Sequence, residues 1–120
     1  MLREFLLVGI GGALGSMARY GLTLLISYFA IASEVSTFVA NALGSLLIGV
    51  IIALAKGDIY LLGAVGFCGG FTTFSTFSSQ ALQLLHNGQR TMGIVYIIAS
   101  LCVCILMTWI GLYIVNRFVK

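Results

Sequence analysis

The stretch GGFTTFSTFSS, residues 69–79, lies within a 31-residue segment, residues 59–89, that carries no formally charged side chain. An apolar segment of this length is typical of a membrane-spanning helix. Its middle, however, holds adjacent glycines, threonines and further hydroxyls, which weaken a helix. Hydrocarbon penalises a loosened backbone because freed N–H and C=O groups find no water there. We therefore expect a functional site at this point, inside the protein or beside a wet cavity.

The composition of the whole chain is that of a membrane protein. Of its 120 residues, 61% are hydrophobic and 8% are charged, whereas a soluble domain typically carries about 25% charged residues. A helix needs roughly 20 residues to cross the hydrocarbon, so four or five crossings fit and a separate soluble domain does not. We predict one domain, residues 1–120, an all-α integral membrane protein. Nucleic-acid binding is not expected, because the chain has no basic stripe.

Charged residues divide the apolar sequence into four predicted transmembrane helices. The predicted spans are residues 5–28, 35–55, 59–85 and 91–116. Gly57 and Gly88 lie in the short connections between them and suit helix ends and turns. We expect the third helix to be broken near its middle. Because proline is absent, the break must come from glycine or hydroxyl side chains, and the pair Gly69-Gly70 costs about 2 kcal/mol of helix propensity.

The distribution of basic residues gives only a weak orientation signal. Four spans put both termini on one side, together with Arg3, Lys56, Arg117 and Lys120, and leave Arg90 on the other. The positive-inside rule then favours termini inside the cell. Since the difference is a few charges, insertion in both orientations is an open alternative.

Small residues favour close helix packing. Gly11 and Gly15 fall on one helix face as a GxxxG motif, which is typical of tight helix–helix contact in membranes. The nearby glycines do not form a nucleotide-binding loop, because no strand precedes them. Cys68, Cys102 and Cys104 form no CxxC pair, and we interpret them as small apolar fillers.

Arg19 is the only ionisable side chain well inside a predicted span. Such residues are costly in a membrane and are functional candidates by default. Two alternatives for Arg19 are snorkelling to the interface and capping the carbonyls of a neighbouring helix end. A cation at a pore mouth would also attract anions.

No Asp or Glu lies inside any predicted span, which restricts the possible functions. Proton-coupled carriers need a titratable carboxylate in the membrane, so a small four-helix multidrug exporter is a weaker alternative. An enzyme is not expected either, because the spans also lack histidine. A structural accessory subunit of a larger membrane complex, which the GxxxG face would suit, is the other alternative.

Neutral hydrogen-bond donors recur every four residues on two spans. They are Thr37, Asn41 and Ser45 on the second span, and Tyr96, Ser100, Cys104 and Thr108 on the fourth. Such donors can bind an anion, although bonds between helices are their commoner role. Phe74 and Phe77 share a helix face, and the positive edges of their rings could also contact a dehydrated anion.

Three motifs resemble those of the small bacterial fluoride channels, the Fluc or CrcB family. They are GGALGSMARY at residues 11–20, TFVANALGS at residues 37–45 and GFCGGFTTFSTF at residues 66–77. The resemblance covers nearly the whole chain. It implies a passive channel that exports toxic fluoride across the bacterial inner membrane. It also implies a dual-topology homodimer of antiparallel subunits with two pores, each lined by both subunits.

The resemblance also implies roles for individual residues. A structural Na⁺ at the dimer centre would be held by the backbone carbonyls of Gly69 and Thr72. The fluoride pathway would comprise Thr37, Asn41, Phe74, Phe77, Tyr96, Ser100, Cys104 and Thr108, with Arg19 in a vestibule or structural role. Cys104 stands where the family usually has serine, and its thiol is a weaker donor.

Overall fold

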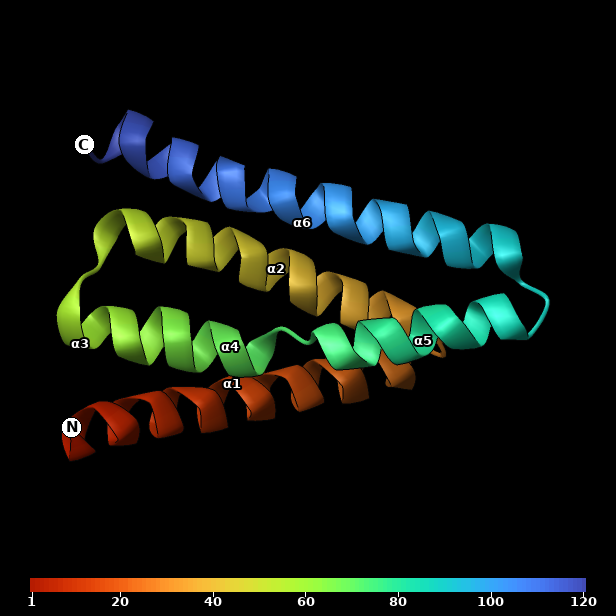
Figure 1. Ribbon diagram of the computed structural model, residues 1–120, viewed down its shortest axis with the longest axis horizontal. Helices are drawn as coiled ribbons and strands as arrows, with labels where there is room; N and C mark the ends of the chain where they lie inside the picture. Colours follow the sequence, from red (N-terminus) through yellow and green to blue (C-terminus); the bar gives the residue numbers. More distant parts are fainter.

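The computed structural model describes residues 1–120, which form helical rods lying side by side and joined by short connections (Figure 1). Four segments are long and apolar enough to cross a membrane: Leu2–Tyr28, Ser33–Leu54, Gly57–His86 and Arg90–Phe118. The four predicted spans are thus confirmed, with bounds that agree to within three residues. The longest axis measures 46 Å, close to the thickness of a bilayer with its headgroups, about 40–45 Å.

Three of the four spans are continuous helices, and the third is composite. The continuous ones are α1 (Leu2–Tyr28), α2 (Ser33–Leu54) and α6 (Arg90–Phe118). The third span begins with α3 (Gly57–Tyr60), a π-helical segment η1 (Leu61–Cys68) and α4 (Gly69–Phe71), and resumes as α5 (Phe74–His86). The gap between α4 and α5 lies near the middle of the molecule (Figure 1).

The break in the third span is confirmed near its middle, and it lies at Thr72 and Thr73 rather than at the adjacent glycine pair. Gly69 remains helical, with φ −60° and ψ −36°, and the backbone becomes extended only at Thr72 and Thr73. Gly70 serves helix packing, because a Cβ there would overlap the carbonyl oxygen of Gly12 on α1.

Glycines let the helices cross with their backbones in direct contact. A Cβ on Gly11 or Gly15 would overlap carbonyl oxygens of η1, which confirms the predicted GxxxG face. The same arrangement joins α2 to α6, where a Cβ on Gly49 would overlap the carbonyl oxygen of Thr108. Where α5 meets α6, a small core forms around Phe77 and Tyr96.

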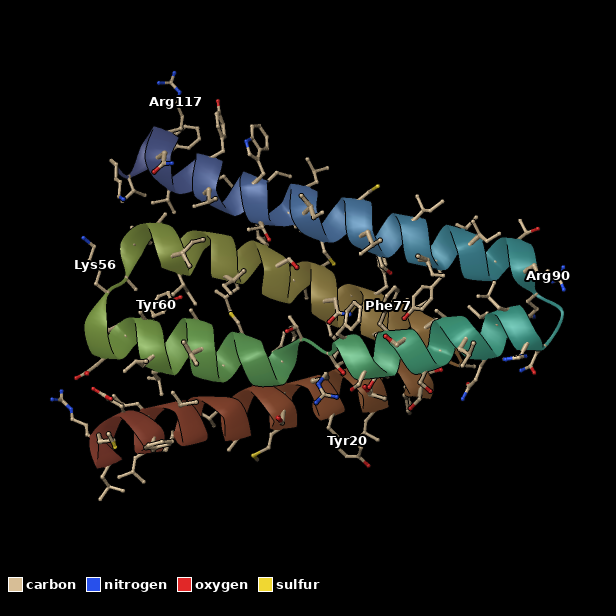
Figure 2. The ribbon with its side chains drawn as sticks, in the orientation of Figure 1. Tyr20, Lys56, Tyr60, Phe77, Arg90 and Arg117 are labelled. Carbon is tan, nitrogen blue, oxygen red and sulfur yellow. The ribbon has the colours of Figure 1, made fainter.

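The two ends of the bundle carry different charges. Both termini lie at one end (Figure 1). Lys56 and Arg117 lie at that same end, and Arg90 lies at the opposite end (Figure 2). An ion pair between Arg3 and Asp58 joins the start of α1 to α3. The connections turn at Gly57 (φ +60°) and Gly88 (φ +80°), a backbone conformation that glycine adopts without strain.

Candidate ion-binding site at the helix break

The break leaves the backbone carbonyls of residues 69–72 without their helical donors, among them those of Gly69 and Thr72. In a continuous α-helix the Gly69 carbonyl would accept from the Thr73 N–H, and the Thr72 carbonyl from the Thr76 N–H. The Thr73 N–H instead donates to Asn41 Oδ1 at 2.7 Å. The Thr76 N–H donates to Thr73 Oγ1 at 3.3 Å, which caps the start of α5. Side chains therefore take both donors, and the carbonyls of Gly69 and Thr72 are released.

Asn41 on α2 bonds both backbone polar groups of Thr73, the N–H and the carbonyl. Its Oδ1 accepts from the Thr73 N–H, and its Nδ2 donates to the Thr73 carbonyl at 3.1 Å. This pair of bonds sets the orientation of the amide, because each of its two groups can play only one of these roles. The amide carries a second N–H, which has no partner in the chain and can serve a ligand.

A cavity of about 370 Å³ adjoins the break, between α2, the third span and α6. It brings together seven of the predicted site residues: Asn41, Gly69, Thr72, Phe74, Phe77, Ser100 and Cys104. No Asp, Glu, Lys, Arg or His lines it. The walls therefore offer uncharged donors, thiols and aromatic rings to whatever enters.

Ser100 presents an unused hydrogen-bond donor to this cavity. The residue is 5% exposed, and its Oγ is the only buried side-chain nitrogen or oxygen that lacks a hydrogen-bond partner. Leaving a buried polar group unpaired costs about 1–3 kcal/mol. A hydroxyl kept at that cost beside a cavity has the property expected of a ligand-binding group.

An aromatic row leads from the break into the core. The ring centroids of Phe74 and Phe77 are 5.5 Å apart with the planes tilted by 50°, and those of Phe77 and Tyr96 are 5.2 Å apart. Phe77 rises from α5 toward the layer formed by α2 and α6 (Figure 2). Phe77 is buried, whereas Phe74 is 73% exposed, so the row ends at the surface of the chain.

Tyr96 has a partner that the sequence analysis missed. Its hydroxyl donates to Gln80 Oε1 at 2.8 Å. Gln80 follows Phe77 by three residues, which puts both on one face of α5. That spacing was a usable signal, because it extends the row of phenylalanines by one polar residue. Tyr96 itself does not line the cavity.

Thr37 and Thr108 also lie outside the cavity lining. The Thr108 hydroxyl donates at 3.1 Å to the carbonyls of Ser45 and Cys104, and so joins α6 to α2. The Thr37 hydroxyl is 3.4 Å from the Ser33 carbonyl within its own helix. Both hydroxyls are engaged in bonds within the chain, which is the commoner role of such residues in membranes.

Arg19 caps the helix that ends at the break. Its Nε donates to the Gly70 carbonyl at 3.0 Å, and the residue is half-buried. Of the two alternatives for Arg19, snorkelling to the interface and capping a neighbouring helix end, the structure shows capping. The Gly70 carbonyl is one of two that lie between Gly69 and Thr72 in the chain, and the carbonyls of Gly69 and Thr72 themselves are not partners of Arg19.

The released carbonyls have the chemistry of a cation site. Carbonyl oxygens are hard ligands that can replace the water around a hard cation. Gly69 is exposed, and no atom lies within 4 Å of the place where its Cβ would be. The donor set therefore fits the Na⁺ that the resemblance implies.

Comparison with known proteins decides the family. The family model described as CrcB-like protein, Camphor Resistance (CrcB), matches residues 6–112. This chain belongs to the CrcB family. The match includes all three motifs and every candidate site residue on the four spans.

Curated relatives of this CrcB chain are named as channels. A "Fluoride-specific ion channel FluC" of Gloeothece citriformis is 42% identical over 120 residues, covering 95% of this chain and 98% of the relative. Relatives with the same name occur in Phocaeicola vulgatus (41% identical; 93% and 98% covered) and in Thermus thermophilus (40%; 92% and 93%). These names confirm the expectation that the chain is not an enzyme. With its four apolar helices, this CrcB protein is a multi-pass membrane protein.

Proposed function

We propose that this chain is a fluoride-selective channel that passively exports fluoride and so relieves its toxicity. The observation that carries the proposal is the unpaired Ser100 hydroxyl, which is buried beside a cavity free of charged side chains. The names of the relatives support fluoride as the ion. The proposed pathway combines side chains that line the cavity with three that lie outside its lining: Asn41, Phe74, Phe77, Ser100 and Cys104, continued by Thr37, Tyr96 and Thr108.

The cavity has the chemistry that a small dehydrated anion needs. Moving a bare ion into an apolar medium costs tens of kcal/mol by idealised estimates, so its lost water must be replaced. The free N–H of Asn41, the Ser100 hydroxyl and the positive ring edge of Phe77 are suitable replacements. Because none of them is charged, they bind loosely enough for release, which conduction requires.

We propose that the working form is an antiparallel homodimer with two pores, each lined by both subunits. Two exposed groups at the break support a second copy. The Phe74 ring is 73% exposed, and the Gly69 carbonyl would face hydrocarbon without a donor, which costs several kcal/mol. The small difference in basic residues between the two ends agrees with insertion in both orientations. The bacterial inner membrane is the proposed location.

A structural Na⁺ at the dimer centre is the proposed cofactor. The carbonyls of Gly69 and Thr72 would hold it, since both are released by the break. When bound, the ion supplies a positive charge that satisfies these carbonyls. Arg19 keeps the intervening Gly70 carbonyl occupied, and so removes that carbonyl from the possible donor set.

Fluoride efflux from liposomes tests the proposed function. Vesicles that contain the purified protein are loaded with fluoride, and a fluoride electrode records its release. We expect release of fluoride but not of chloride. Phe77→Ile should abolish it, because the ring edge is lost. Phe5→Ile at the start of α1 should conduct normally, because Phe5 is 71% exposed and does not line the cavity. Equal chloride and fluoride rates would refute selectivity, and normal flux through Phe77→Ile would refute the pathway.

Two further measurements test the assembly and the metal. In a cysteine-free background, Arg117→Cys should react with a membrane-impermeant maleimide from both sides of the membrane, and labelling from one side alone would refute dual topology. In a crystal of the dimer, density for a cation should lie on the twofold axis beside Gly69 and Thr72. A water-filled or protein-filled axis there would refute the sodium site.

A further inference from the structure

A second cavity, of about 420 Å³, lies at the end of the bundle that carries Arg90 (Figure 2). Its lining includes Ala32 and Gln89, the residues that directly precede α2 and α6. Because two membrane-spanning helices begin there, this cavity lies where the bundle meets water. Tyr96, which does not line the cavity at the break, lines this second cavity.

Side chains on α6 connect the two cavities. Ser100 lines the cavity at the break, and Tyr96, which precedes it by one helical turn on the same face, lines the second cavity. The ring of Tyr96 also packs against Phe77, another residue of the first cavity, with the ring centroids 5.2 Å apart. The proposed fluoride pathway includes all three residues, and it therefore leads from the first cavity toward the second.

Glu34 continues the polar row of α2 toward the same end. It precedes Thr37 by three residues and Asn41 by seven, a spacing that puts the three side chains on one helix face. Asn41 lines the cavity at the break, and Glu34 lines the second cavity. Glu34 is the only charged residue in the lining of either cavity.

The charge of Glu34 is not neutralised by an ion pair. The only salt bridge of the chain joins Arg3 to Asp58. Arg90 lines a hollow that adjoins the second cavity, but it does not pair with Glu34. Glu34 is half-buried, and most residues around the second cavity are hydrophobic. Walls of low dielectric constant focus the field of a charge into the space between them.

We propose that Glu34 sets the rate at which fluoride passes the second cavity, because its carboxylate repels the ion there. This inference rests on the proposed function. The repulsion acts on any small anion, so Glu34 adjusts the rate and leaves selectivity to the uncharged cavity at the break. In the proposed antiparallel homodimer, each face of the membrane has one such cavity.

Fluoride efflux from liposomes, measured at two ionic strengths, tests this role. At about 0.01 M salt the field of a charge reaches roughly 30 Å, and at about 1 M only roughly 3 Å. At low salt, Glu34→Gln should raise efflux about two- to fivefold, the factor expected for a unit charge roughly 4–8 Å from the ion in water. Glu34→Lys should raise it further, and Glu34→Asp should conduct like wild type. These differences should vanish at high salt, and chloride should stay excluded.

Glu4→Gln is the matched control. Glu4, like Glu34, is an acidic residue in the first turn of a helix, but it is exposed and lines neither cavity. Its efflux should equal that of wild type at both ionic strengths. The wild-type protein supplies a readout without any substitution, because its efflux at a fixed fluoride gradient should rise as salt screens the carboxylate.

A structural role is the competing explanation, since an acidic side chain in the first turn stabilises a helix. That role predicts a lower melting temperature for Glu34→Gln with no gain in efflux, and this result would overturn the inference. Equal efflux through wild type and Glu34→Gln at low salt would also overturn it and would leave the proposed function standing. If wild type released no fluoride at either ionic strength, the proposed function would fail, and the role of Glu34 with it.

Discussion

Replacing Ser100 with alanine should move stability and transport in opposite directions. The hydroxyl is buried without a partner, and such a group costs about 1–3 kcal/mol. Ser100→Ala removes the group and leaves no other atom unpaired. We therefore expect the free energy of unfolding to stay constant or to rise by up to about 1–3 kcal/mol.

The same substitution should weaken fluoride transport. A hydrogen bond to a charged partner contributes about 1.5–3 kcal/mol, and every 1.4 kcal/mol is a factor of ten in an equilibrium constant. If the Ser100 hydroxyl binds the permeating ion, its loss should reduce fluoride occupancy and efflux about 10- to 100-fold.

The assay pairs liposome efflux with thermal unfolding of the detergent-purified protein. Ser27→Ala is the matched control, because that hydroxyl is exposed and bonds the Leu24 carbonyl of its own helix at 2.8 Å. The control should change neither efflux nor unfolding by much. Wild-type efflux through Ser100→Ala would refute the role of the hydroxyl. A marked loss of stability would show instead that the group has a structural partner.

Three other substitutions, one of them with a matched control, test the scaffold of the helix bundle. Asn41→Leu removes two hydrogen bonds to Thr73. It should lower the free energy of unfolding by about 2 kcal/mol and abolish efflux. Unchanged stability would contradict a stabilising role of these bonds. Gly49→Ala should destabilise by about 1–3 kcal/mol through overpacking, because its Cβ meets backbone of α6. Gly9→Ala, with open space around it, should not, and equal melting temperatures for the two would oppose this reasoning. Arg19→Met removes a charged cap and should cost about 1.5–3 kcal/mol in denaturation experiments; unchanged stability would refute the capping role.

Much of this architecture is readable from local sequence. The length of the apolar segments defines the four spans. Gly57 and Gly88 mark two of the turns, and Gly11 with Gly15 marks the crossing of α1 with η1. These features depend on periodicity and on the size of single residues, which the sequence states directly. The motif at residues 66–77 likewise located the break to within a few residues.

The features that sequence reasoning missed depend on contacts between distant segments. Propensity favours a break at Gly69-Gly70, but the structure breaks at Thr72 because Asn41, from another helix, takes the Thr73 N–H. The engagement of Thr108 with α2 and the π-helical form of Leu61–Cys68 have no comparable local signal. That Cys68 and Cys104 line one cavity likewise depends on how the helices pack.

The glycine crossings described above have a consequence for how the protein responds to its surroundings. Where α1 meets η1 and where α2 meets α6, main-chain atoms touch without intervening side chains. The distance between the helix backbones at these points does not depend on any side-chain rotamer. We therefore expect warming or a change of lipid to disturb the outer side chains before it changes the width of the ion pathway. Selectivity for a small ion benefits from walls whose separation is set by peptide geometry.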